Sequence, residues 1–240
     1  MSDEVLEKIS DPAGQHAGAR SRTYAAFAEM FGYPDEEYFE AVRSGTLAEA
    51  LREVLKNVDP SLAEGADADW EALSNAGEGE DDLAVEFTRL FDVGASGPPC
   101  PLYGGLYIGA RMKTMEEAVR FYNHFGLTLS ESPHELPDHL TTELEFLHFL
   151  AFREAQTIEK GEDPGAYRRA QRDFLARHPG RWIPKMRAKL EAQSPMPFFL
   201  GLVRRLESFL LSDGAHLVAV AGPPPPPSAT PAPGLDSKPH

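Results

Sequence analysis

Two side chains that could bind a metal ion lie four residues apart near the middle of the chain. His139 and Glu143 would share one face of a helix at this spacing, and imidazole and carboxylate groups are both ligands of zinc and iron. His148 falls at a different angular position, and no complete ligand set is visible. One open alternative is therefore a metal-binding helical enzyme that uses His139, Glu143 and Glu135, which a zinc or iron assay on the purified protein would test.

Catalytic patterns of other kinds are missing from the sequence. Cys100 is the only cysteine among 240 residues and lies between two prolines. A single thiol excludes an intramolecular disulfide framework and a cysteine-rich zinc or iron–sulfur site held by this chain alone, and no basic neighbour is there to activate it. The chain also lacks glycine-rich phosphate loops, a nucleophile elbow and the zinc-protease motif. The sequence therefore predicts neither an enzyme nor a cofactor.

The segment 135–140 suggests partner binding instead. Pro137 and Asp138 are typical of a helix start, with Asp138 as the capping residue. A cationic His139 is unfavourable at the positive end of a helix dipole, so its place in the first turn points to another task, such as a hydrogen bond to a ligand. A capped helix start with no further role is the alternative.

The segment 98–107 is rich in both proline and glycine, which predicts a stiff, irregular loop between two helices. It nevertheless carries two apolar and two aromatic side chains: Leu102, Tyr103, Leu106 and Tyr107. These side chains must either plug the core or face a partner, because water does not favour them.

The elements that position these residues carry helical periodicity. Apolar residues recur every three or four positions through most of the chain, and strict alternation is nearly absent. Thr46 with Glu49, and Thr114 with Glu117, have the spacing of a capping box, and a last apolar helix is expected over about 198–211. The predicted fold class is all-α, an irregular bundle of eight or more helices.

Composition divides the chain into three parts. We expect a flexible N-terminus over residues 1–20 and a single all-helical domain over 21–221. Residues 222–240 contain eight prolines in nineteen positions, which predicts a disordered Pro-rich tail. A helical scaffold that binds partners through this tail is a second alternative, and deletion of the tail would test it.

The net charge of −15 argues against a nucleic-acid partner. An acidic stretch over 59–82 is interpreted as a solvated loop, and a basic stretch over 168–189 as a solvated helix face. No apolar run reaches the roughly 18 residues that a membrane span needs, and the polar N-terminus is unlike a secretory signal. These features favour the cytoplasm.

Four segments, in order along the chain, resemble motifs of the TorD/DmsD/NarJ-type chaperones of molybdenum-cofactor oxidoreductases. They are Glu86 to Phe91 (EFTRLF), the proline-rich loop with Tyr103 to Tyr107 (YGGLY), Glu135-x-x-Asp138-His139-Leu140 with the helix that follows, and Phe174 to Pro184 with His178 and Trp182. The chain departs from the family where it has Gly105 in place of a frequent Ser and Ala95 in place of an aromatic residue. The prolines around Cys100 resemble the subgroup that serves dimethyl sulfide, selenate, chlorate and ethylbenzene dehydrogenases.

The resemblance implies a system-specific cytoplasmic chaperone, not an enzyme. Such a protein binds the catalytic subunit of one molybdoenzyme, aids cofactor insertion and masks the twin-arginine signal peptide until the subunit is folded. Both a monomer and a helix-swapped dimer are compatible with it.

We expect one client-binding surface groove that combines aromatic side chains with flanking carboxylates, which would pair with the arginines of a signal peptide. Its predicted residues are Phe87, Leu90, Tyr103, Gly104, Tyr107, Glu135, Asp138 and His139.

Overall fold

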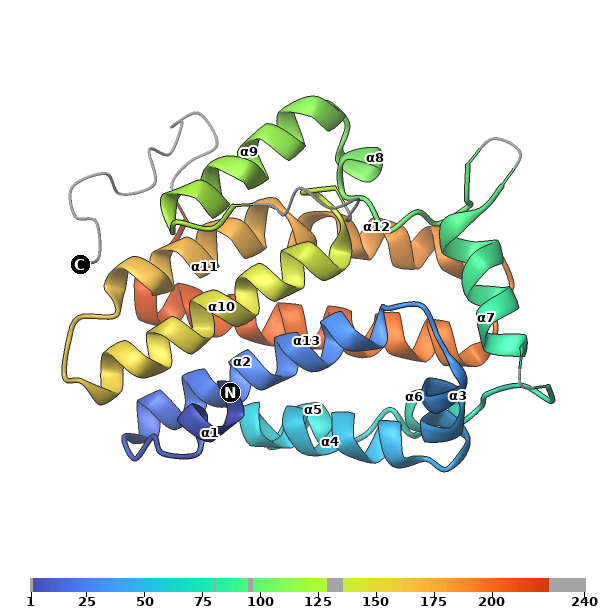
Figure 1. The fold of residues 1–240 in the computed structure, drawn as a ribbon, viewed down its shortest axis with the longest axis horizontal. Helices are drawn as coiled ribbons and strands as arrows, with labels where there is room; N and C mark the ends of the chain where they lie inside the picture. The colour runs from blue at the N-terminus through green and yellow to red at the C-terminus, as the bar shows by residue number, and fades with distance from the viewer. Residues whose placement is uncertain (1, 80, 95–96, 129–135, 225–240) are drawn as a thin grey trace.

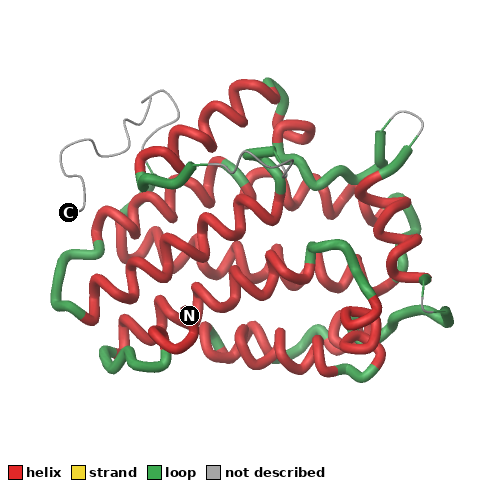
Figure 2. Tube along the Cα trace, in the orientation of Figure 1, coloured by secondary structure: helices red, strands yellow, loops and turns green. Residues whose placement is uncertain are grey.

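The computed structural model describes residues 2–79, 81–94, 97–128 and 136–224, and within these ranges all regular structure is helical (Figure 2). This confirms the predicted all-α bundle of eight or more helices. The helices are α1 (Ser2–Leu6), α2 (Pro12–Met30), α3 (Glu36–Arg43), α4 (Thr46–Val58), α5 (Pro60–Ala63), α6 (Asp67–Ala72), α7 (Asp82–Phe87), the π-helical turn η1 (Thr88–Asp92), α8 (Gly105–Ile108), α9 (Arg111–His124), α10 (Leu140–Glu159), α11 (Gly165–Arg177), α12 (Pro179–Glu191) and α13 (Pro197–Ala221). In these ranges no helix is long and apolar enough to cross a bilayer.

Helices α2, α10 and α13 form the centre of the bundle, with α8 and α9 along one edge and α4 along the other (Figure 1). The most extensive helix pair is α2 with α10. Their apolar stripes have the predicted spacing, and the side chains on them are fully buried, including Tyr24, Phe27, Leu144 and Leu147. The long α13 completes this core with Phe198, Phe199 and Phe209, among others.

A buried charge cluster joins four helices of the bundle. The guanidinium of Arg20 on α2 donates to Glu154 on α10 at 2.9 Å and to Gln171 on α11 at 2.6 Å, and it also pairs with Asp213 on α13. Burial alone would raise the pKa of Glu154, but the charges of Arg20 and Arg168 hold that pKa below its usual value. The cluster therefore keeps its charges by pairing them, as buried ions require.

This cluster corrects two predictions. Residues 1–20 were expected to be flexible, yet α2 begins at Pro12, Asp11 caps it, and Arg20 at its middle has no exposed surface. The segment is polar in sequence, but the guanidinium of Arg20 is buried inside the bundle. Arg168, expected on a solvated face, donates to Glu154 at 2.6 Å instead.

Helix boundaries also differ from the expected ones. Helix α9 starts at Arg111, so Thr114 lies inside it and turns its hydroxyl back to the carbonyl of Ala110, at 3.4 Å. Helix α4 starts at Thr46 itself, after Gly45 in the left-handed region at φ 78°. Neither capping box forms, because in each case the helix includes the Thr. Helix α13 continues ten residues beyond the expected end at 211, to Ala221. Most of the predicted Pro-rich tail, residues 225–240, lies outside the described residues.

Candidate functional site

The proline- and glycine-rich loop docks against the start of α10 through backbone hydrogen bonds. The amide of Leu140 donates to the carbonyl of Leu102 at 2.8 Å, and the amide of Gly104 donates to the carbonyl of Asp138 at 2.8 Å. Between these bonds Tyr103 and His139 form an isolated antiparallel bridge, and their rings meet edge to face at 4.9 Å. These contacts confirm the prediction that the loop and the start of α10 lie together.

Asp138 acts on the loop rather than on its own helix. Its side chain is fully buried, and Oδ2 accepts the amide N–H of Gly105 at 2.9 Å. The capping residue of α10 is instead His139, whose Nδ1 faces the amide N–H of Thr141 at 3.4 Å and the Thr141 hydroxyl at 2.7 Å. His139 thus takes the capping role that the sequence analysis gave to Asp138.

Two glycines allow the loop to approach the bundle this closely. A Cβ on Gly104 would lie 2.7 Å from the indole nitrogen of Trp182. A Cβ on Gly105 would lie 2.8 Å from Oδ2 of Asp138 and 2.9 Å from the Cα of Arg111. Distances this short are not tolerated without movement, so the close approach of the loop requires glycine at both positions.

Behind the loop lies a buried polar group that the sequence did not assign to it. The Tyr107 ring stacks on Trp182 at 5.4 Å, and Trp182 donates its indole N–H to Oε2 of Glu143 at 2.8 Å. Oε1 of Glu143 lies 3.4 Å from Nδ1 of His178. Burial raises the pKa of Glu143 well above its usual value and lowers the pKa of His178 to about 4. The imidazole of His178 is therefore neutral at pH 7, and its contact with Glu143 is no ion pair.

The outer face of the loop is apolar and aromatic, with cations beside it. Tyr103 and Tyr107 are half-buried, while Leu106 and Met112 are 51% and 67% exposed. The guanidinium of Arg111 lies 5.9 Å from the centre of the Tyr103 ring. Of the two predicted flanking carboxylates, Asp138 is buried and turned towards Gly105, and Glu135 lies outside the described residues.

The other two predicted groove residues lie elsewhere. Phe87 is buried against Tyr33, Phe91 and Phe199, with ring centres 5.2 to 6.2 Å apart. Leu90 has no exposed surface and reaches the loop only through its carbonyl, which accepts the Cys100 amide at 2.9 Å. Leu90 and Phe91 lie on the π-helical turn η1, and both side chains are buried in the core.

The sequence of this chain is similar to those of several known proteins. Residues 45–188 match the family model described as nitrate reductase delta subunit. The chain is 35% identical to the perchlorate reductase assembly chaperone protein of Dechloromonas aromatica, over 90% of this chain and 95% of that protein. It is 33% identical to the dimethyl sulfide dehydrogenase assembly chaperone protein of Rhodovulum sulfidophilum, over 89% and 87%. Chaperone protein TorD of Vibrio parahaemolyticus is 27% identical, over 83% and 94%.

The chain belongs to the nitrate reductase delta subunit family. The resemblance to TorD-type assembly chaperones is thus confirmed. Three of the four motif segments that carried it meet at one place in the bundle: the loop, the start of α10, and the His178–Trp182 turn of α12. The fourth, Glu86 to Phe91, supports the loop from the core side.

The described residues do not provide a set of metal ligands. No group of three or more His, Cys, Asp or Glu residues among them gathers in a way that could hold an ion. Glu143 accepts from Trp182, and His139 caps α10. Cys100 is fully buried, and burial raises the pKa of its thiol, which is the opposite of what a nucleophile needs.

Proposed function

We propose that this protein is the dedicated assembly chaperone of one molybdoenzyme and holds its catalytic subunit until cofactor insertion is complete. The observation that carries the proposal is the similarity over most of the chain to assembly chaperones of perchlorate reductase and dimethyl sulfide dehydrogenase. The docked loop supports it, because a rigid aromatic surface suits recognition of a partly folded chain.

The client contacts the outer face of the loop in this proposal. The side chains that it meets are Tyr103, Leu106, Tyr107 and Met112, with His139 at the edge. Asp138, Gly104 and Gly105 act indirectly, because they fix the loop on α10 and α12. A surface held by backbone hydrogen bonds loses little entropy when a partner binds, which favours affinity.

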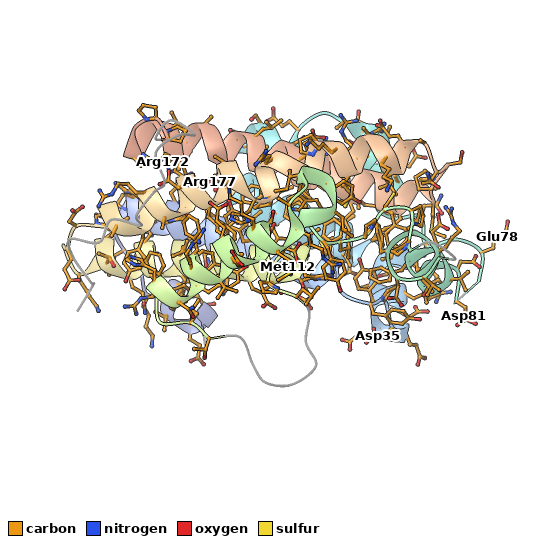
Figure 3. The ribbon with its side chains drawn as sticks, turned by 90° about the horizontal axis from the view of Figure 1, so that it is seen from above. Asp35, Glu78, Asp81, Met112, Arg172 and Arg177 are labelled. Carbon is orange, nitrogen blue, oxygen red and sulfur yellow. The ribbon has the colours of Figure 1, made fainter. Side chains whose placement is uncertain are left out.

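A twin-arginine signal peptide of the client is bound as well, in the cytoplasm, which delays export until the subunit is folded. Its arginines would pair with exposed carboxylates, and Asp138, the predicted carboxylate within the described residues, is buried. Exposed carboxylates lie at the end of the molecule that carries α3 and α7, where Asp35, Glu78 and Asp81 are exposed (Figure 3) and Tyr33 is 63% exposed. We therefore place the leader at that end and the mature subunit at the loop.

The test is production of a molybdoenzyme catalytic subunit from the same genome, with and without this protein. We expect the subunit to contain bound molybdenum cofactor in a much larger fraction when the chaperone is present. Equal cofactor content in both preparations would refute the chaperone function. Removal of the signal peptide from the subunit should weaken its binding to the chaperone without abolishing it, and unchanged affinity would refute binding of the leader.

A further inference from the structure

Five exposed cations surround the outer face of the loop. Arg111 and Lys113 lie at the start of α9, and Arg181, Lys185 and Lys189 lie on α12. The three residues of α12 are spaced by four positions, which places them on one helix face. We call these five residues the basic strip.

Printed contacts connect the basic strip to the aromatic residues of the loop. The ammonium group of Lys185 donates to the carbonyl of Tyr107 at 3.2 Å, and that of Lys189 lies 5.8 Å from the centre of the Tyr107 ring. Arg111 covers the Tyr103 ring in the same way. The strip and the exposed Leu106 and Met112 therefore form one continuous surface that is both cationic and apolar.

The five cations of the basic strip form no ion pair with any Asp or Glu of the described residues, although the chain as a whole carries −15. Other basic residues of α11 and α12 are paired: Arg177 with Glu117, Arg172 with Asp173, and Arg187 with Glu191 and Glu207. The acidic surplus lies elsewhere, and Figure 3 places Asp35, Glu78 and Asp81 at the far end from Arg172 and Arg177.

A cleft of about 740 Å³ adjoins the strip between the start of α9 and helices α11 and α12. Its walls combine the apolar side chains of Ile108, Ala110 and Ala176 with the cations Lys113 and Arg181. Two carboxylates also line it, and each is paired with an arginine: Glu117 with Arg177 and Asp173 with Arg172. A cleft of this size can take one or two apolar side chains while a neighbouring carboxylate meets the cations.

We propose that the basic strip is the docking surface for an acidic segment of the client's catalytic subunit, one that interleaves carboxylates with apolar or aromatic residues. The inference rests on the proposed chaperone function and specifies the chemistry of the client segment. Carboxylates pair with Lys and Arg through charge-assisted hydrogen bonds, and the apolar residues cover Leu106, Met112 and the adjoining cleft. The overall negative charge of the chaperone repels an acidic client everywhere else, so the strip also fixes the orientation of binding.

A single-stranded nucleic acid fits this surface less well than an acidic peptide. Stacking of bases needs free aromatic faces. The Tyr107 ring has Trp182 on one side and is approached by Lys189, and the Tyr103 ring is approached by His139 and Arg111. Phosphate attraction would remain, but it would act against the net charge of the whole chain.

The experiment measures binding of a labelled peptide that alternates Glu with Leu and Phe, and of the same peptide with Gln in place of each Glu. The test variant is Lys185→Gln with Lys189→Gln. The matched control is Lys56→Gln with Lys160→Gln, two exposed lysines on α4 and at the end of α10, which removes the same net charge. We expect the test variant to bind the Glu peptide about tenfold more weakly than wild type, the control to bind it normally, and the Gln peptide to bind weakly to all three. Affinity for the Glu peptide should fall as salt rises.

Equal binding of the Glu peptide by the test variant and the control would overturn the proposal, and so would equal binding of the Glu and Gln peptides by wild type. Displacement of the peptide by a single-stranded oligonucleotide at lower concentration than by unlabelled Glu peptide would assign the strip to nucleic acid instead. The same variants are then tested for capture of a co-expressed catalytic subunit. If wild type captures the subunit and the test variant captures it equally well, the strip proposal fails and the chaperone function stands. If wild type captures none, the chaperone function itself fails.

Discussion

Trp182 donates its indole N–H to the carboxyl group of Glu143 across 2.8 Å, and both side chains are fully buried. The contact joins α12 to α10 directly behind the loop that carries Tyr107. Because Tyr107 stacks on Trp182, the position of the exposed aromatic surface depends on this internal hydrogen bond. The spacing of Glu143 from His139 suggested a metal ligand. Its carboxyl group instead supports the loop through Trp182.

Replacement of Glu143 by Gln tests whether this carboxyl group is neutral. Its pKa is raised by burial above the ordinary 4.5, so its contribution to stability is full below pH 4.5 and is lost as pH rises through the folded-state pKa. Gln keeps an oxygen acceptor for Trp182 and has no proton to lose. We expect Glu143→Gln to be at least as stable as wild type at pH 7 to 8, measured by denaturant unfolding. The exposed Glu145→Gln on the same helix is the control, and a clear loss at pH 7 in Glu143→Gln alone would show that the group is ionised.

Because His178 is buried, we expect the protein to lose stability in acid. Burial lowers its pKa from 6.5 to about 4 in the folded protein, so the unfolded chain takes up the proton first as pH falls from 6.5 towards 4. This difference costs on the order of 3 kcal/mol across that window. His16 and His216, whose pKa values are also lowered by burial, add to the slope in the same direction. We expect His178→Asn to flatten the dependence of unfolding free energy on pH, and the control His124→Asn to leave it unchanged. Identical slopes for both variants would contradict the neutral, buried imidazole.

Asp138 should matter more than a helix cap does. Its removal in Asp138→Ala leaves the buried N–H of Gly105 without an acceptor, which we expect to cost about 1 to 3 kcal/mol. Asp138→Asn keeps a side-chain oxygen and should lose less. Chemical denaturation of the three proteins measures both values. If the free energies of unfolding of Asp138→Ala and Asp138→Asn are both the same as that of wild type, the carboxylate does not hold the loop.

We expect Gly105→Ser, which introduces the residue that the family resemblance suggested for this position, to destabilise the protein. The added Cβ would lie 2.8 Å from Asp138 and 2.9 Å from the backbone of Arg111, and such overpacking costs about 1 to 3 kcal/mol. The control is Gly214→Ser on α13, where a Cβ meets only Leu175, at 3.6 Å. Thermal unfolding that ranks Gly214→Ser below Gly105→Ser in stability would be the contrary result.

Much of the fold could be predicted because apolar periodicity is local information. The stripes of α2 and α10 and the irregular loop between α7 and α8 follow from residues a few positions apart. The pairing of the loop with the start of α10 followed from the family resemblance, since nothing in spacing alone brings Tyr103 to His139.

The rest depends on partners that are remote in sequence. Arg20 is buried because Asp213, 193 positions away, and Glu154, 134 positions away, meet it inside the bundle. Asp138 serves Gly105, 33 positions earlier, and so left the capping role to His139. Local patterns carry no signal for either of these pairings. Leu90 and Phe87 were expected in the client groove, but both side chains are buried in the core, which their i, i+3 apolar spacing favours.

The most direct test of the client site is the affinity of a molybdoenzyme catalytic subunit for wild type, Tyr103→Ala and Arg169→Ala, measured by calorimetric titration with the co-expressed pair as the reference complex. Tyr103 lies at the outer face of the docked loop, and Arg169 is an exposed residue of α11 outside it. We expect Tyr103→Ala to bind roughly tenfold more weakly, as loss of an aromatic anchor does, while Arg169→Ala binds as wild type and all three proteins melt at similar temperatures. Equal affinity of Tyr103→Ala and wild type for the subunit would contradict a client site on this loop.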